Sequence, residues 1–308
     1  MQTKNLFKSL PSTQQQCGVQ NGKRSGKGGT NFTPVQNDTV DHDPIDDDTQ
    51  NPYITGGRYA RPGELPFQVF LRAPMGNGGS MTCGGSVITN RCVVTAGHCV
   101  FICGQGQVQR VPYVEVTFGD YDLRMSDGEY GMTSSDIRPH QSYRPCTSTF
   151  KNDIALICFQ SEIPMRMTPN GYGSIGTICP PESDSFTTAT TSGWGQTTQG
   201  FQGPPSPILK VAEVNYLDVE TCRYQLWLNG GGLDWNIDPN LQICVSQGNG
   251  GRDGACHGDS GGPLFLTDTG RAVLIGIVSY GPQNCPANNP AVYTRVSAYR
   301  TWINQMMG

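Results

Sequence analysis

Three short motifs in this chain carry side chains whose types suit nucleophilic catalysis. Ser260 lies within GDSGGP, His98 within TAGHC and Asp153 within NDIAL. A serine hydroxyl is a poor nucleophile until a base takes its proton, and a carboxylate can orient that base and stabilise its cation. The glycines around Ser260 permit a sharp turn whose backbone N–H groups can point at one developing oxyanion. These residues predict hydrolysis by a Ser, a His and an Asp.

The elements that must position these residues are short strands. Glycine and proline are abundant, with 40 and 22 of 308 residues, and only 15% of the chain is charged, against a typical ~25%. Two helices are expected, one after a cap at Asp218 and one over 297–307. Seven β-rich runs alternate with turns and indicate antiparallel barrels: 66–71, 92–96, 113–118, 153–159, 211–217, 272–280 and 291–296.

The first part of the chain has a different composition. Residues 1–53 are polar, have no apolar periodicity and contain the acidic stretch 38–48. Like charges repel and cannot build a core, so we predict a disordered pro-segment at 1–53 and a folded domain at 54–308. Asn31 and Asn37 stand in glycosylation sequons, which suit a secreted glycoprotein.

Composition excludes several classes of function. The net charge of −4 gives no basic field for nucleic acid, and no apolar run of 18 residues exists to span a membrane. The first residues lack the apolar core of a signal peptide, so the chain is either cytosolic or has lost its start. Twelve cysteines argue for an oxidising, extracellular setting. Four histidines and no C-x-x-C pair argue against a zinc site.

The three motifs, in the order His, Asp, Ser, resemble those of the trypsin/chymotrypsin-like serine proteases. ITGG at 54–57 and SYG at 279–281 add to this resemblance, which covers 54–308. It implies an all-β fold of two antiparallel six-stranded β-barrels with a C-terminal helix. It also implies that His98 is the general base, Asp153 its orienting partner and Ser260 the nucleophile.

The resemblance also assigns an oxyanion hole and a substrate pocket. The N–H groups of Gly258 and Ser260 would bind the oxyanion, and Ser279 would lie beside the catalytic Asp. The pocket positions correspond to Gly254, Gly281 and Ala291. An open, uncharged pocket favours a large apolar residue before the scissile bond. Two alternatives stay open: Asp253 could select a basic residue, or the pocket could take small residues.

Activation by cleavage is a further expectation from the resemblance. Cleavage between Tyr53 and Ile54 would free an α-ammonium group that pairs with Asp259, whose buried carboxylate would otherwise carry a large desolvation penalty. Relatives of this type carry Arg or Lys where this chain has Tyr53. The activating protease must therefore accept tyrosine, and the predicted apolar pocket would allow this protein to activate itself in trans.

The family pattern implies four disulfides: Cys83–Cys99, Cys222–Cys244, Cys256–Cys285 and Cys17–Cys179, the last tethering the pro-segment. For the other cysteines, proximity in sequence suggests 92–103 and 146–158, with a buried free Cys92 as an alternative. The linker that begins at Cys17 resembles that of arthropod clip-domain cascade proteases, although no six-cysteine clip domain is present.

Asp120, Asp122 and Asp127 resemble a loop that holds calcium in some family members. Hard oxygen ligands suit Ca²⁺, but an acidic surface turn is the alternative reading, and no other cofactor is expected. The sequence thus predicts a secreted endopeptidase made as a zymogen, whose partners are protein or peptide substrates, an activating protease and protein inhibitors. A catalytically inactive homologue serving as a cascade cofactor is the alternative function, against which the intact Ser, His and Asp argue.

Overall fold

The computed structural model describes most of the chain from Gly57 onward. The described residues are 17–18, 57–76, 78–104, 106–147, 150–197, 204–229, 236–251, 253–268, 270–282, 285 and 288–307. The predicted disorder of the pro-segment, its sequons and the cleavage site at Tyr53 and Ile54 lie outside these residues.

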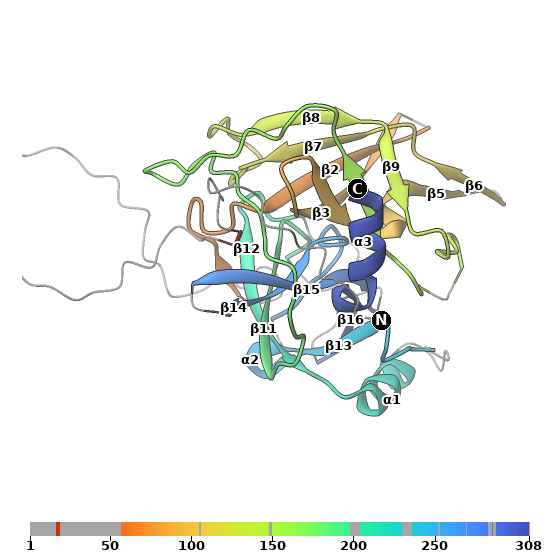
Figure 1. Cartoon of the computed structure of the whole chain (residues 1–308). Coiled ribbons are helices and arrows are strands. Elements are labelled where there is room, and N and C mark those ends of the chain that lie inside the picture. Colours follow the sequence, from red (N-terminus) through yellow and green to blue (C-terminus); the bar gives the residue numbers. More distant parts are fainter. Residues whose placement is uncertain are drawn as a thin grey trace, which may run out of the picture.

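The first half of the domain is an antiparallel sheet that curls until its two edges are neighbours in the chain. Its strand order is β8-β7-β2-β3-β4-β10-β9, and only Ser135 separates β8 from β9. Figure 1 shows this half in orange to lime above the second half. Its strands are β2 (Gln68–Met75), β3 (Gly79–Val87), β4 (Cys92–Thr95), β7 (Val114–Phe118), β8 (Tyr130–Ser134), β9 (Asp136–Pro139) and β10 (Ala155–Cys158).

The second half is a closed antiparallel barrel of six strands, with β1 added at an edge. The order is β1-β12-β11-β14-β15-β16-β13, and a further pairing of β12 with β13 closes it. The prediction of an all-β, two-barrel fold is therefore confirmed, with the first barrel left open. The strands are β1 (Arg58–Tyr59), β11 (Thr188–Gly193), β12 (Lys210–Tyr216), β13 (Gln242–Gln247), β14 (Pro263–Asp268), β15 (Arg271–Tyr280) and β16 (Ala291–Arg295).

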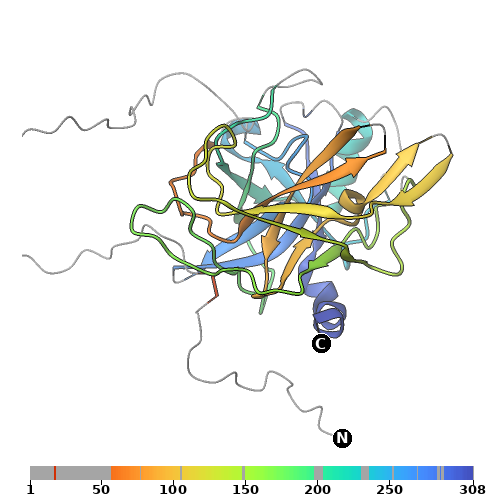
Figure 2. The same ribbon diagram turned by 90° about the horizontal axis from the view of Figure 1, so that it is seen from above.

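Helices are few and lie outside the barrels. In α1 (Val219–Asn229), the Oδ1 atom of Asp218 accepts the Thr221 N–H at 3.0 Å, which confirms the predicted cap. The C-terminal helix α3 runs alongside the first barrel (Figures 1 and 2), and Trp302 and Ile303 belong to an apolar core cluster that residues of both barrels share. The remaining elements are α2 (Gly248–Gly251), α3 (Arg300–Met307), the 3₁₀ turns η1 (Gly97–Val100) and η2 (Val296–Tyr299), and the hairpin of β5 (Phe101–Gly104) and β6 (Gln107–Arg110).

Six disulfides take up all twelve cysteines. The four pairs implied by the family pattern form as expected, including Cys17–Cys179. The pairs guessed from proximity are wrong, as is a free Cys92: the structure joins Cys92 to Cys158 and Cys103 to Cys146. The reason is strand pairing, because Cys92 on β4 stands directly opposite Cys158 on β10. Sequence proximity therefore misleads in a sheet built from non-local pairs.

Candidate active site

Strand pairing brings His98 and Asp153 together from distant parts of the chain. β4 and β10 pair antiparallel, with Thr95 opposite Ala155. His98 follows the end of β4 in the turn η1, and Asp153 immediately precedes β10. Because the end of one strand lies beside the start of its antiparallel partner, both side chains occupy the same end of the first barrel.

Asp153 is held by three polar groups although it is wholly buried. Its Oδ2 lies 2.8 Å from Nδ1 of His98, and its Oδ1 accepts the His98 backbone N–H at 2.8 Å. Ser279 donates its hydroxyl to Oδ2 at 2.5 Å. Burial opposes protonation of His98, but the charge of Asp153 and its hydrogen bond outweigh this, so the pKa of His98 lies above its usual value. Asp153 thus fixes the imidazole and favours its cation.

Ser260 reaches the same place from a turn of the second barrel. The Gly84 N–H of the first barrel donates to the Ser260 carbonyl at 2.7 Å, and the Gly261 N–H donates to the Val278 carbonyl at 2.9 Å. Gly261 has φ of +78°, and a Cβ there would lie 2.1 Å from the Thr95 hydroxyl. Only glycine fits this junction of the two barrels. Gly258, with φ of +99°, forms the start of the same turn.

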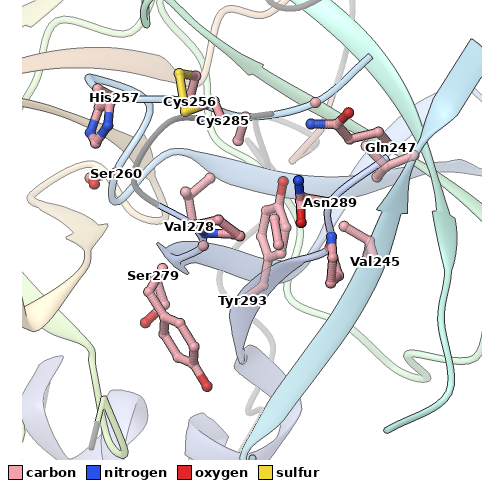
Figure 3. A pocket seen from close by; sticks show the side chains of 18 of the residues that line it. Val245, Gln247, Cys256, His257, Ser260, Val278, Ser279, Cys285, Asn289 and Tyr293 are labelled. Carbon is pink, nitrogen blue, oxygen red and sulfur yellow. A yellow bond between two sulfur atoms is a disulfide. The ribbon is translucent and has the colours of Figure 1, made fainter. Parts of the chain in front are cut away.

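One cavity of about 250 Å³ contains His98, Ser260 and every predicted pocket residue: Gly254, Ser279, Gly281 and Ala291. Figure 3 shows Ser260 at one end of this cavity and the side-chain amides of Gln247 and Asn289 at the other. Gln247 packs against Gly254, since a Cβ on Gly254 would lie 3.0 Å from the Gln247 Cγ. Uncharged groups therefore form the floor of the cavity.

Asp253 lies elsewhere. It is 7% exposed and lines a separate cavity beside Gly57 and Arg58, and it is not among the residues that line the cavity of Ser260. This position disfavours the alternative in which Asp253 selects a basic residue.

Asp259, the residue that precedes Ser260 in the sequence, is buried. Its Oδ1 accepts the Gly195 N–H at 2.8 Å, and its Oδ2 accepts the Cys256 N–H at 2.9 Å. Burial raises the pKa of Asp259 to about 6, although these two hydrogen bonds and the charges of Lys210 and His257 lower it. The carboxylate thus sits in a site that disfavours its charge, as expected for a group that needs a cationic partner. Its predicted partner Ile54 lies outside the described residues.

Two aromatic residues of the site were missed in the sequence. Phe150 stacks on Tyr280 with ring centroids 4.9 Å apart, and its ring meets His98 edge-on at 6.2 Å. Both line the cavity of Ser260. Phe150 stands three residues before Asp153, and Tyr280 lies within the SYG motif. Aromatic residues this close to motif residues are the signal that could have identified them.

The acidic loop at 119–130 offers oxygen atoms to a cation. Asp120 and Asp127 each have one buried carboxylate oxygen without a hydrogen-bond partner. Burial and then the charges of Asp127, Glu129 and Asp122 raise the pKa of Asp120 to about 7. The Nε–H group of Arg124 donates a hydrogen bond to the Oδ1 atom of Asp122 at 2.8 Å. The two unpaired oxygens fit a hard cation, with Asp120 and Asp127 as the residues that would hold it.

Elsewhere in the described part of the chain, one group of three has the spacing of metal ligands: Cys83, His98 and Cys99. Since the two cysteines form a disulfide, this group is not a metal site. None of the described helices is long and apolar enough to cross a membrane.

Comparison with known proteins agrees with the geometry. The sequence model of the Trypsin family matches residues 54–303, so the chain belongs to the trypsin family of serine proteases. It is 32% identical to the proclotting enzyme of Tachypleus tridentatus over 82% of this chain and 66% of that protein. It is 34% identical to the CLIP domain-containing serine protease B4 of Anopheles gambiae, over 81% of this chain and 69% of the relative.

A third relative is the serine proteinase stubble of Drosophila melanogaster, 32% identical over 81% of this chain but only 30% of that protein. The chain thus spans from under a third to about two thirds of these relatives. The similarity to clip-domain and trypsin-like proteases expected from the sequence is confirmed.

Proposed function

We propose that this protein is a secreted serine endopeptidase, made as a zymogen, that hydrolyses peptide bonds through His98, Asp153 and Ser260. One observation carries the proposal: a buried Asp153 holds the ring of His98 at 2.8 Å, and His98 and Ser260 line the same cavity. Membership of the trypsin family and six disulfides support it.

The mechanism follows from the positions of these groups. His98 takes the proton of the Ser260 hydroxyl as its oxygen attacks the substrate carbonyl, and then passes that proton to the leaving amine. Asp153 orients the ring and stabilises the imidazolium between these two steps. The N–H groups of Gly258 and Ser260 bind the oxyanion, an interaction typically worth on the order of 10²–10³ in rate for each donor.

The cavity favours a large apolar residue before the scissile bond. Gly254, Gly281 and Ala291 leave it open, and Val245 and Val278 supply apolar walls. Tyr53 in the activation site is a residue that such a pocket accepts. Cleaved molecules would therefore cut after Tyr53 of uncleaved ones, and the new Ile54 ammonium group would pair with Asp259. Cys17–Cys179 would then keep the cleaved pro-segment attached.

Protein or peptide substrates, the activating protease and protein inhibitors would be the partners. A Ca²⁺ ion held by Asp120 and Asp127 would have a structural role, since both belong to a loop that contributes nothing to the cavity of Ser260. It would offset the repulsion between the carboxylates of this loop.

A panel of tetrapeptide substrates tests the activity and its specificity together. We expect the chain cleaved before Ile54 to hydrolyse substrates with Phe, Tyr, Leu or Met before the scissile bond. The Ser260→Ala variant, cleaved in the same way, is the matched control and should be inactive. Hydrolysis after Arg or Lys alone would contradict the apolar pocket. No hydrolysis of any peptide would favour the inactive homologue that serves as a cascade cofactor.

A further inference from the structure

The disulfide Cys103–Cys146 differs from the other disulfides of the described residues in its exposure to solvent. Both of its cysteines are exposed. In each of the other pairs at least one cysteine is at most 8% exposed. Disulfide exchange begins when a thiolate attacks a sulfur atom, so its rate depends on access. Cys103–Cys146 is therefore the bond that a dissolved thiol reaches most readily.

This disulfide joins two surface segments that flank His98. Cys103 stands near the tip of the hairpin of β5 and β6, opposite Val108, and the hairpin begins directly after η1, the turn of His98. Cys146 stands in the loop before Phe150, whose ring meets His98 edge-on at 6.2 Å. Two distant parts of the chain that both approach His98 are thus linked covalently.

The described contacts of the hairpin other than this disulfide lie at its base. There the Val111 N–H donates to the Val100 carbonyl at 3.0 Å, and the ring of Phe101 packs against Tyr143 with centroids 5.9 Å apart. Further out, the last two residues of β5 and all four of β6 are exposed, and the hairpin projects from the barrel (Figures 1 and 2). Because an isolated two-stranded hairpin is marginally stable, its outer end depends on the disulfide for a fixed position.

The hairpin stands outside the cavity of Ser260. None of its described residues, and none of the described residues of 140–147, lines that cavity. A short peptide that fills the cavity would not meet the hairpin, whereas a folded substrate would, because its body extends past His98. The described exposed side chains of the hairpin are mostly polar, with Val108 as the large apolar one. This composition suits an obstacle to bulky substrates better than a docking surface.

We propose that Cys103–Cys146 is a redox site that a dithiol reduces before the other disulfides, and that its reduction frees the hairpin and admits folded substrates that the fixed hairpin excludes. One thiolate of the dithiol attacks a sulfur atom of the pair. The S–S bond breaks, a mixed disulfide forms and the other cysteine leaves as a thiolate. The second thiol of the reagent then displaces the first cysteine. The reagent becomes a disulfide, and the two cysteines gain its two electrons and two protons.

The rest of the domain should keep its structure through this reduction. The sheet of the first barrel includes neither β5 nor β6, and neither Cys103 nor Cys146 belongs to the buried core. Cys83–Cys99, beside His98, has both cysteines 3% exposed. This inference deepens the proposed function and rests on it, because it concerns which substrates reach Ser260.

The test uses the full chain, cut between Tyr53 and Ile54 by a tyrosine-specific protease that is then removed, and titrates it with dithiothreitol. Free thiols are alkylated at each step and located by peptide mapping. Two substrates report the activity: a tetrapeptide amide, and the same four residues placed in a surface loop of a folded carrier protein. The double variant Cys103→Ser with Cys146→Ser is the matched control, since it has no bond there to reduce.

We expect Cys103 and Cys146 to be alkylated first, at a dithiothreitol concentration that leaves the other pairs closed. At that point kcat/KM for the carrier protein should rise at least about tenfold, because the access of a folded partner limits its association. For the tetrapeptide, kcat/KM should stay within about twofold, since the hairpin lies outside the cavity. The double variant should cleave the carrier at the raised rate without dithiothreitol and show no further change with it.

Alkylation of another pair before Cys103 and Cys146, or a carrier rate that does not rise when this pair opens, would overturn the proposal. A tetrapeptide rate that falls in step with the opening would show a merely structural role and would also overturn it. If the unreduced cut chain does not hydrolyse the tetrapeptide at all, the proposed function itself is wrong. If the double variant does not fold, the titration of the native chain decides, and reoxidation should restore the low carrier rate.

Discussion

Two buried aspartates, one from each half of the molecule, have opposite surroundings. Asp153 of the first barrel receives a backbone N–H, an imidazole and a hydroxyl, all within 2.8 Å. Asp259 of the second barrel receives two backbone N–H groups, and burial still raises its pKa to about 6. The neighbours of Asp153 supply it with three hydrogen-bonding groups. Asp259 needs more positive charge than its immediate contacts provide, because burial still disfavours its charged form.

In the proposed function, this difference would separate the catalytic base from its control. The pair of His98 and Asp153 is complete in the described residues. The turn at Gly258 and Ser260 would depend on the charge balance at Asp259, which cleavage before Ile54 would change. Regulation in this protein would therefore act on the oxyanion hole and the pocket rather than on the base.

The largest effect is expected at Asp153. Asp153→Asn keeps the shape of the residue but favours the wrong tautomer of His98, so kcat of the cleaved enzyme should fall by about 10⁴. Steady-state kinetics on the best tetrapeptide substrate measures this. A loss below about tenfold would show that Asp153 has only a structural role.

A smaller effect is expected at Asp259. Asp259→Asn removes the charge that the Ile54 ammonium group would bind, and the cleaved enzyme should lose on the order of 10²–10³ in kcat as the oxyanion hole loosens. The same kinetic assay applies, with Asp253→Asn as a buried, neutralised control that should keep most activity. If Asp259→Asn retains full activity, the contrast between the two aspartates has no functional meaning.

The hydrogen bond from Ser279 to Asp153 gives a further prediction for the first of the two aspartates. Ser279→Ala removes a hydrogen bond to Asp153, which should cost about tenfold in kcat/KM. Asp153 would then attract the proton of His98 more strongly and raise its pKa further. Activity requires neutral His98 and is lost as the pH falls through that pKa, so the acid limb of the pH profile should move to higher pH. An acid limb that stays in place would contradict this coupling.

The carboxylates at Asp120 and Asp127 should show the smallest effect, and on stability alone. Both have unpaired buried oxygens. Ca²⁺ should raise the melting temperature of the whole chain by a few degrees, about 1 kcal/mol for a domain of this size. Asp120→Asn should remove that response. An unchanged melting temperature after EDTA treatment in salt-matched buffer would mean that the loop is an acidic turn without a metal.

Much of the fold could be predicted from the sequence because its buried strands read as apolar runs. The run DIALICF contains β10, all four of whose residues are buried. The strand β3 was missed because its sequence GSMTCGGSV is rich in glycine. Its glycines are needed where backbones approach: a Cβ on Gly84 would lie 3.0 Å from the Gly262 Cα. Contacts across the barrels, which local patterns cannot show, decide such positions.

Site residues could be predicted where they stand in a sequence motif, but not where strand register determines which residues are neighbours. His98, Asp153 and Ser260 stand in recognisable motifs. As those motifs suggest, His98 contacts Asp153 in the structure, and His98 and Ser260 line the same cavity. The burial of Lys210 was not predicted, because in the sequence this residue is an ordinary polar residue before the run VAEVNYL. Only strand register places it opposite Gly193 and Tyr59, inside the sheet. The pairing of Cys92 with Cys158 was missed for the same reason.

The most direct test of the proposed catalytic centre is fluorophosphonate labelling of the chain cut between Tyr53 and Ile54, followed by peptide mapping. We expect one modified residue, Ser260, and loss of the label in both Ser260→Ala and His98→Ala. A cut chain that takes up no label, or that is labelled at another serine, would contradict the claim that Ser260, His98 and Asp153 form the catalytic centre.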